Sequence, residues 1–265
     1  MEEINVKKQA WEFFVYATLG IVPKELFDEL NYNGFLPPLE NSEWNYEKYC
    51  TFMCAKAAYH DLCRTLTFKD QYRDIKGNKI DDIKAKEDAI NSICVILMNA
   101  IYDSQGCIHT EPDKLFPLFT NDDGSVKNDF KLLEYLEKTD DHPQKINFGH
   151  IQKWVNMTMK YLYLLGFVKS DKNLHIPIDS YIIDALWEEK DVPLPIKSGE
   201  RKTAYKKPSD HVVAWSQWTK TDYDNMFASI IKELKPSPMA WEHEAWIRIA
   251  ETRKGVKETG AKEQI

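Results

Sequence analysis

Apolar side chains at the spacing of one helix face recur along most of the chain, and this feature limits the possible folds more than any other. In the first such segment Trp11, Phe14, Val15 and Thr18 follow the i, i+3, i+4, i+7 pattern of one helix face. Runs in which apolar and polar residues alternate between hairpin turns would indicate strands, and such runs are scarce. The sequence therefore predicts an all-α fold, with helices over these segments: 5–19, 23–30, 44–66, 81–102, 128–138, 149–165, 179–189, 220–235 and 238–252.

The length and composition suit one helical domain with a sizeable core. The chain has 265 residues, of which 43% are hydrophobic. We expect a single domain over 1–265, with a possible division into an N-terminal lobe at 1–140 and a second lobe at 141–255. Polar residues over 70–79 predict a loop, and the charged tail after Arg253 is expected to fray.

Neither a membrane span nor a secretory signal is evident in the sequence. No run approaches the roughly 18 apolar residues of a membrane helix, and the acidic Met1-Glu2-Glu3 start lacks the basic residues of a signal peptide. We therefore expect a cytoplasmic protein with no membrane association.

The cysteines indicate free thiols rather than a disulfide framework. There are five of them, an odd number: Cys50, Cys54, Cys63, Cys94 and Cys107. Cys50 and Cys54 share a helix face and could join a metal site, but no His or Cys pair at zinc-finger spacing follows them. Buried free thiols are the favoured interpretation, and we expect no metal and no cofactor.

The stretch 147–187 holds the most informative pattern of helix-terminating residues. Gly149 begins a helix and Gly166 ends it, as glycine commonly does at a helix C-terminus. Pro177 favours extended backbone before it, and Asp179 is well placed as the N-cap of the next helix. Taken alone, this pattern predicts only that Asp179 caps a helix and that the Lys153 side chain lies on the protein surface.

The same residues resemble the helix-hairpin-helix DNA glycosylases, the superfamily of endonuclease III and 8-oxoguanine glycosylase. Phe148-Gly149-His150-Ile151-Gln152-Lys153-Trp154-Val155-Asn156 lies over the family's hairpin, and Pro177-Ile178-Asp179-Ser180-Tyr181 lies over its Pro-Val-Asp segment. The resemblance covers about 40 residues, and Ile151 stands where the second hairpin glycine would be. It implies a helical DNA-glycosylase-like fold with a degenerate helix-hairpin-helix. It also implies that Lys153 is the nucleophile and Asp179 the essential aspartate.

Further residues are assigned to DNA contacts on the basis of this resemblance. The hairpin of such a protein binds DNA phosphate, which suggests contacts from Gly149, His150 and Gln152. Lys160 is a second cation on the helix of Lys153, and a basic segment contains Lys197, Arg201 and Lys202. Trp215 and Trp218 are candidates for a base pocket, although their spacing fits a buried helix face equally well. The formal net charge of −7 disfavours coating of nucleic acid but permits a local basic patch.

Three functions remain open at this point. The first is a DNA glycosylase, with or without abasic-site lyase activity, that acts on double-stranded DNA with a flipped base. The second is a protein of the same fold that has lost catalysis and binds nucleic acid or a protein partner. The third is a helical interaction protein with no role on nucleic acid.

The cysteine pattern yields a prediction about metal content. Protein purified without chelators should carry neither an iron–sulfur cluster nor structural zinc, because no cysteine follows Cys107 and the earlier ones lack ligand spacings. Elemental analysis by mass spectrometry measures this directly. One iron or zinc per chain would show that Cys50, Cys54 and Cys63 bind metal.

Overall fold

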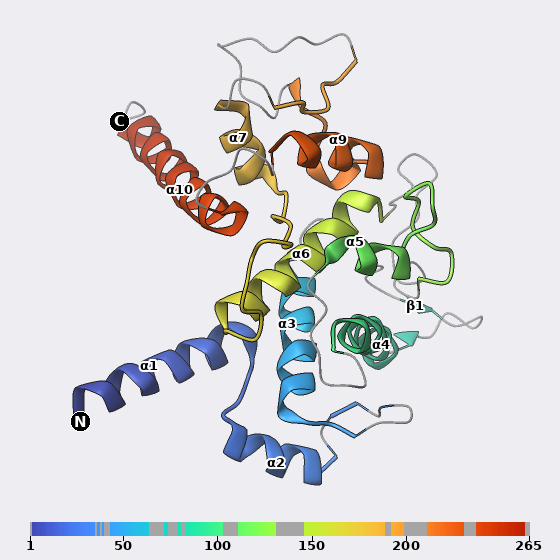
Figure 1. Cartoon of the computed structure of the whole chain (residues 1–265), viewed down its shortest axis with the longest axis vertical. Coiled ribbons are helices and arrows are strands. Elements are labelled where there is room, and N and C mark those ends of the chain that lie inside the picture. Colours follow the sequence, from blue (N-terminus) through green and yellow to red (C-terminus); the bar gives the residue numbers. More distant parts are fainter. Residues whose placement is uncertain are drawn as a thin grey trace. The chain divides into compact units, whose positions relative to one another are not determined.

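Helices dominate the computed structural model, which describes residues 2–34, 36–37, 39, 43–63, 72–73, 79–80, 83–102, 111–130, 146–188, 192–198, 211–230 and 237–262. The predicted all-α class is confirmed, and Figure 1 shows the helices in chain order. The α-helices of the described residues are α1 (Glu2–Leu19), α2 (Lys24–Tyr32), α3 (Tyr46–Cys63), α4 (Ile83–Ile101), α5 (Pro112–Leu115), α6 (Phe148–Leu164), α7 (Ser180–Glu188), α9 (Lys220–Ile230) and α10 (Pro238–Lys262). Two 3-10 helices are η1 (Phe116–Leu118) and η3 (Trp215–Gln217).

Two elements differ from the sequence prediction. Within the stretch predicted as a loop, β1 (Tyr72–Arg73) pairs with β2 (Lys79–Ile80) in an antiparallel ladder. The last helix extends to Lys262 instead of fraying after Arg253. Most of the predicted helix at 128–138 lies outside the described residues.

The chain forms two compact units whose bounds do not follow the predicted lobes. The first comprises Met1–Glu111, Asn128–Lys145 and Met157–Lys169, and the second comprises Pro112–Lys127, Ile146–Asn156 and Ser170–Ile265. The helix α6 therefore contributes its first half to the second unit and its second half to the first unit. A division of the sequence at one position cannot reproduce this exchange of segments.

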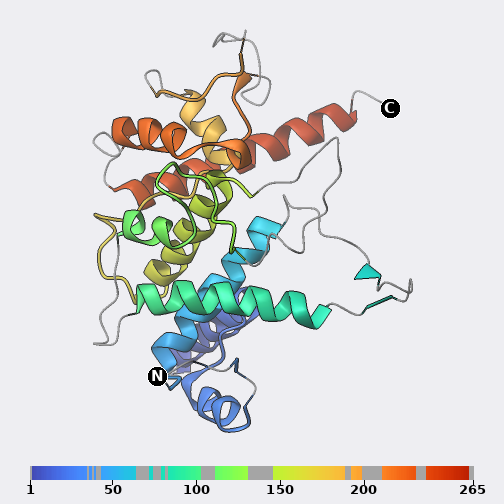
Figure 2. The ribbon, with the colours of Figure 1, turned by 90° about the vertical axis from the view of Figure 1, so that its right-hand side faces the viewer.

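The core of the first unit is built on α3 and α4, which pack against each other; in Figure 2, α4 crosses in front of α3. Side chains from both helices are almost completely buried there: Tyr49, Phe52, Ala55, Ile93, Leu97 and Met98. The helix α1 contacts α3 as well. None of the helices within the described residues is both long enough and apolar enough to cross a membrane.

Cys50 and Cys54 lie inside this core as free thiols. Burial raises the pKa of Cys50 to about 12 and raises that of Cys54 well above its usual value. Both thiols therefore stay protonated at neutral pH, which favours the free-thiol interpretation over a metal site. Among the residues that the structure describes, no group of three or more potential metal ligands is found.

The second unit is built around aromatic side chains that meet at the start of α6. Phe116, Phe148 and Tyr223 contact one another with ring centroids 5.2 to 5.8 Å apart. Phe119 contacts Trp154 at 5.0 Å. These edge-on and tilted contacts are the arrangements that aromatic rings prefer, and they fix α6 within this unit.

The first turn of α6 rests directly on the backbone of η3. The Gly149 N–H donates to the Trp218 carbonyl oxygen at 3.0 Å. A Cβ atom at Gly149 would lie only 1.9 Å from the Trp215 carbonyl oxygen. Only glycine permits this approach, which places the N-terminus of α6 beside η3.

This contact predicts a large difference between two glycine substitutions. In an open helix Gly149→Ala would stabilise the protein by about 1 kcal/mol, but the clash with η3 should make it destabilising by about 3 kcal/mol. Gly166→Ala is the matched control, because Gly166 has a φ of +78° and open space around its Cα. It should cost about 1–2 kcal/mol from backbone strain alone. Urea unfolding measures both free energies, and equal losses would contradict the close approach.

Candidate functional site

The site begins with a reciprocal cap at the N-terminus of α6. The Asn147 carbonyl accepts the His150 N–H at 3.0 Å, and the Asn147 N–H donates to His150 Nδ1 at 3.1 Å. The second of these hydrogen bonds is one half of a capping box, with histidine in the place of the usual Glu or Gln, while the Asn147 side chain donates to the Ser216 carbonyl at 3.2 Å. His150 is 4% exposed, and burial lowers its pKa to about 4, with a further contribution from the positive charge of Lys153. The imidazole is therefore neutral and can accept this hydrogen bond.

A buried extended segment leads from the loop after α6 to α7. Leu174, Ile176 and Ile178 are at most 1% exposed. Such a segment cannot use water to satisfy its backbone N–H and C=O groups, and each unpaired group would cost about 1–3 kcal/mol. Pro177 has no N–H, and the groups on either side of it that α6 pairs are the Ile176 carbonyl and both the N–H and the carbonyl of Ile178.

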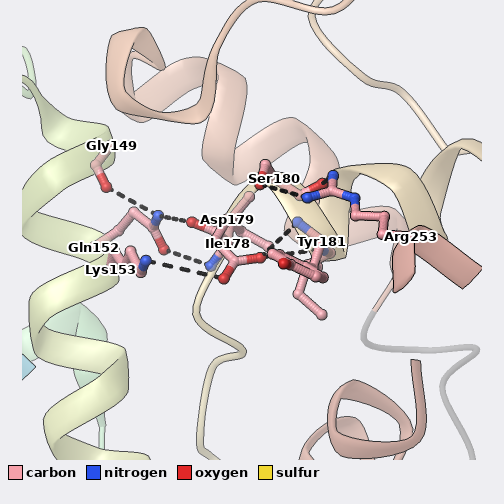
Figure 3. A network of polar contacts seen from close by, with 9 residues as sticks. Gly149, Gln152, Lys153, Ile178, Asp179, Ser180, Tyr181 and Arg253 are labelled. Atoms are coloured by element: carbon pink, nitrogen blue, oxygen red, sulfur yellow. Dashed lines mark hydrogen bonds and ion pairs between the residues drawn. The ribbon is translucent and has the colours of Figure 1, made fainter. Parts of the chain in front are cut away.

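Gln152 of α6 pairs with the backbone of Ile178 on both sides (Figure 3). Its Nε2 donates to the Ile178 carbonyl at 3.0 Å, and its Oε1 accepts the Ile178 N–H at 3.2 Å. The same Nε2 donates to the Gly149 carbonyl at 2.9 Å. The Gln152 side chain is completely buried and replaces the neighbouring strand that an extended segment would otherwise require.

Asn156, one turn further along α6, serves the same segment. Its Nδ2 lies 3.2 Å from the Ile176 carbonyl oxygen and 2.8 Å from the Tyr223 hydroxyl oxygen. The Tyr223 hydroxyl hydrogen is then left for His175 Nδ1, at 3.0 Å. Burial lowers the pKa of His175 to about 3, so its contact with Asp113 at 3.7 Å is not an ion pair at neutral pH.

Asp179 uses its two carboxylate oxygens for different purposes. Oδ1 accepts the N–H groups of Tyr181 and Ile182, at 2.9 and 3.0 Å, and so caps α7 as predicted. Oδ2 lies 3.9 Å from Nζ of Lys153. Figure 3 shows this carboxylate between the N-terminus of α7 and the amine on α6. The structure thus brings together the two residues that the family resemblance singles out.

The surroundings of Lys153 are only partly open to water. Its side chain is 13% exposed, and that of Asp179 is 19% exposed. The Lys153 amine lies 4.8 Å from the centroid of the Trp215 ring, within the range of a cation–π contact. The amine is therefore held between an aromatic face and a carboxylate.

Arg253 of α10 supports the start of α7 from the other side. Its Nε donates to Asp184 at 3.0 Å, and its Nη2 donates to the Ser180 carbonyl at 3.0 Å. The guanidinium also lies 4.0 Å from the centroid of the Tyr181 ring. These contacts connect α10 to the turn that carries Asp179, and the sequence analysis did not identify this role of Arg253.

Several predicted nucleic-acid contacts are corrected by the structure. The Gly149 amide is occupied by the Trp218 carbonyl, and His150 and Gln152 are buried within the second unit. The Gly149 N–H and the Gln152 Nε2 hydrogens are taken by carbonyl groups of the protein, and the His150 side chain is buried with its Nδ1 accepting from Asn147. Trp218 is also completely buried, with Nε1 donating to the Val213 carbonyl at 2.9 Å, so it is a core residue and not a pocket wall.

The structure describes two of the four remaining predicted contacts. Lys160 lies on the half of α6 that belongs to the first unit. Lys197 belongs to the second unit and is exposed, and its backbone N–H donates to the His211 carbonyl at 2.7 Å. Arg201 and Lys202 lie outside the described residues. That these four basic residues contact nucleic acid stays a prediction.

The role of Gln152 also differs from the one predicted. A signal for it exists in the sequence, because Gln152 and Asn156 are amides four residues apart on a helix whose other positions, such as Ile151 and Val155, are apolar and buried. Two amides at this spacing can serve one partner segment.

Comparison of the chain with protein-family models, with curated proteins and with solved structures found no match. The functional inferences below therefore rest on the residues and geometry of this chain, together with the resemblance of its 148–156 and 177–181 segments.

The neutral state of His150 predicts a loss of stability in acid. Its folded pKa of about 4 lies below the usual 6.5, so the unfolded chain takes up the proton first and stability falls as the pH falls below about 6.5. Between pH 7 and about 5.5 this should cost about 1 kcal/mol for His150, and about the same for His175. His150→Gln should remove the first contribution and keep the cap, because glutamine is a usual capping-box residue. Urea unfolding over this pH range measures the slope, and an unchanged slope in the variant would contradict the assignment.

Proposed function

We propose that this protein is a DNA N-glycosylase that removes a damaged or modified base, with Lys153 as its nucleophile and Asp179 as its essential carboxylate. We further propose that the covalent intermediate on Lys153 gives it abasic-site lyase activity. The observation that carries the proposal is the 3.9 Å separation between Lys153 Nζ and Asp179 Oδ2. Lys153 lies on α6 and Asp179 caps α7, and the family resemblance singles out these two residues.

The chemistry needs an amine and a carboxylate at this spacing. The neutral amine of Lys153 attacks C1′ of the sugar, the N-glycosidic bond breaks, and its electron pair leaves with the base, which takes up a proton. The amine must first lose a proton, and the Asp179 carboxylate lies where it can receive it. The C1′–N bond formed on Lys153 then becomes a Schiff base when the sugar ring opens.

Asp179 has a second contribution, which is electrostatic. Positive charge develops on the sugar as the base departs, and a fixed carboxylate stabilises that charge. The two N–H groups that Oδ1 accepts hold the carboxylate in place.

A second candidate function is a protein of this fold that binds nucleic acid or a protein partner without catalysis. The burial of Gly149, His150 and Gln152 favours this candidate, because a hairpin that cannot donate to phosphate lacks a docking element of the family. In that case the contact of Lys153 with Asp179 is a structural ion pair and Asp179 only caps α7. The two candidates differ in whether Lys153 reacts.

The proposal predicts that the protein forms a covalent adduct with abasic-site DNA in the presence of borohydride. Lys153→Gln should abolish the adduct, because the amide cannot form a Schiff base. Asp179→Asn should keep the cap, since asparagine caps about as well as aspartate, and should lower stability by less than about 1 kcal/mol. It should nevertheless slow trapping about 100-fold or more, because the carboxylate that takes up the proton of the Lys153 amine is lost.

Denaturing gels measure the adduct, and circular dichroism verifies that each variant is folded. Lys172→Gln is the matched control: it removes an exposed lysine of the second unit that is assigned no contact with DNA, and it should leave trapping intact. Binding to abasic DNA without any adduct would instead support the second candidate, and absence of both would overturn the proposal.

A further inference from the structure

We infer that Gln152 is a positioning residue that sets the placement of Asp179 against Lys153. The catalytic meaning of this inference rests on the proposed function, but the placement itself is a property of the free protein. Gln152 precedes Lys153 in α6, and Ile178 precedes Asp179 before α7. The side chain of the first residue binds the backbone of the second at both its N–H and its C=O.

The Lys153–Asp179 contact is too loose to align itself. At 3.9 Å it exceeds the roughly 2.7–3.2 Å of a hydrogen bond. Both side chains keep some exposure to water, and ion pairs of this kind contribute only about 0.2–1 kcal/mol. The alignment of the two groups must therefore come from the elements that carry them.

Gln152 supplies that alignment because it is both buried and fully used. Its amide has two donors and an acceptor oxygen, and these engage the Gly149 carbonyl, the Ile178 carbonyl and the Ile178 N–H. The Ile178 N–H belongs to the peptide group before Ile178, and its carbonyl belongs to the peptide group that joins Ile178 to Asp179. Gln152 therefore holds both peptide groups, and rotation of either one, which would move Asp179, breaks a hydrogen bond to Gln152. Arg253 restrains the following residue through the Ser180 carbonyl.

Asn156 provides a matched comparison on the same helix. It is equally buried and also binds the extended segment, but at the carbonyl of Ile176, which lies further from Asp179 in the chain. Its Nδ2 also lies 3.2 Å from Gln152 Oε1. Asn156→Leu therefore removes one partner of Gln152 but leaves both of its hydrogen bonds to Ile178 in place. A purely structural role for such amides predicts similar effects on the pair from Gln152→Met and Asn156→Leu. The positioning role predicts an effect specific to Gln152→Met.

The test is a mutant cycle read out on the Lys153 amine in the free protein. Acetic anhydride labels neutral amines, and mass spectrometry of tryptic peptides gives the labelling rate of Lys153 relative to other lysines. The Lys153 amine must leave its contact with Asp179 before it reacts with the reagent. Asp179→Asn should therefore raise the labelling rate about threefold in the wild-type background, as suits a partly exposed ion pair. In the Gln152→Met background Asp179→Asn should change the Lys153 labelling rate little. In the Asn156→Leu background Asp179→Asn should still raise that rate about threefold.

Two results would overturn the inference. One is a threefold response that persists in Gln152→Met, and the other is a response that disappears equally in Asn156→Leu. Circular dichroism at low temperature establishes that the variants are folded. If Gln152→Met does not fold, Gln152→Asn replaces it, because its amide is one methylene too short to reach Ile178, and the same two results decide the outcome.

Trapping on abasic DNA separates this inference from the proposed function. Gln152→Met should slow the single-turnover trapping rate at saturating DNA while DNA affinity is retained. A protein whose Lys153 labelling follows the mutant cycle but that never traps DNA contradicts the proposed function and supports the positioning role. A protein that traps DNA but whose labelling does not depend on Gln152 contradicts the positioning role alone.

Discussion

The second unit depends on how a buried extended segment satisfies its backbone. Ile176 and Ile178 lie in the core, no strand among the described residues pairs with them, and the amides of Gln152 and Asn156 take the place of such a strand. An unpaired buried N–H or C=O costs more than a typical hydrogen bond contributes, so this pairing is a requirement of the fold and not an addition to it. It ties α6 to the turn before α7, and the relative placement of Lys153 and Asp179 follows.

The same arrangement combines a fixed backbone around Asp179 with a loosely held amine on Lys153. The cap on α7 occupies one oxygen of Asp179 and leaves the other facing Lys153. The Lys153 amine has Trp215 on one side and is bound by no short hydrogen bond to Asp179. Neutral His150 holds the first turn of α6 through Asn147, and its protonation in acid would remove that acceptor. Fixed backbone and a loosely held amine are compatible with a group that must change partners during a reaction.

Sequence reasoning located α6, α7 and the Asp179 cap because these depend on local signals: periodic apolar positions, Gly166 and Pro177. It failed where tertiary packing decides. Gln152 stands beside Lys153 and was assigned to DNA, but its partner Ile178 is distant in the sequence. Trp218 is buried by contacts that no local pattern encodes. The helix α10 continues past Arg253, and Arg253 binds α7 through Ser180 and Asp184. The pairing of Lys153 with Asp179 came from family resemblance and not from spacing.

The central claim is that Lys153 is the reactive amine of a site completed by Asp179. Peptide mapping of the borohydride-reduced adduct with abasic DNA tests it most directly, because mass spectrometry identifies the modified residue irrespective of any substitution. The structure and the proposed chemistry predict that the sugar remnant lies on the peptide containing Lys153. An adduct on the N-terminal amine or on any other lysine would contradict the claim.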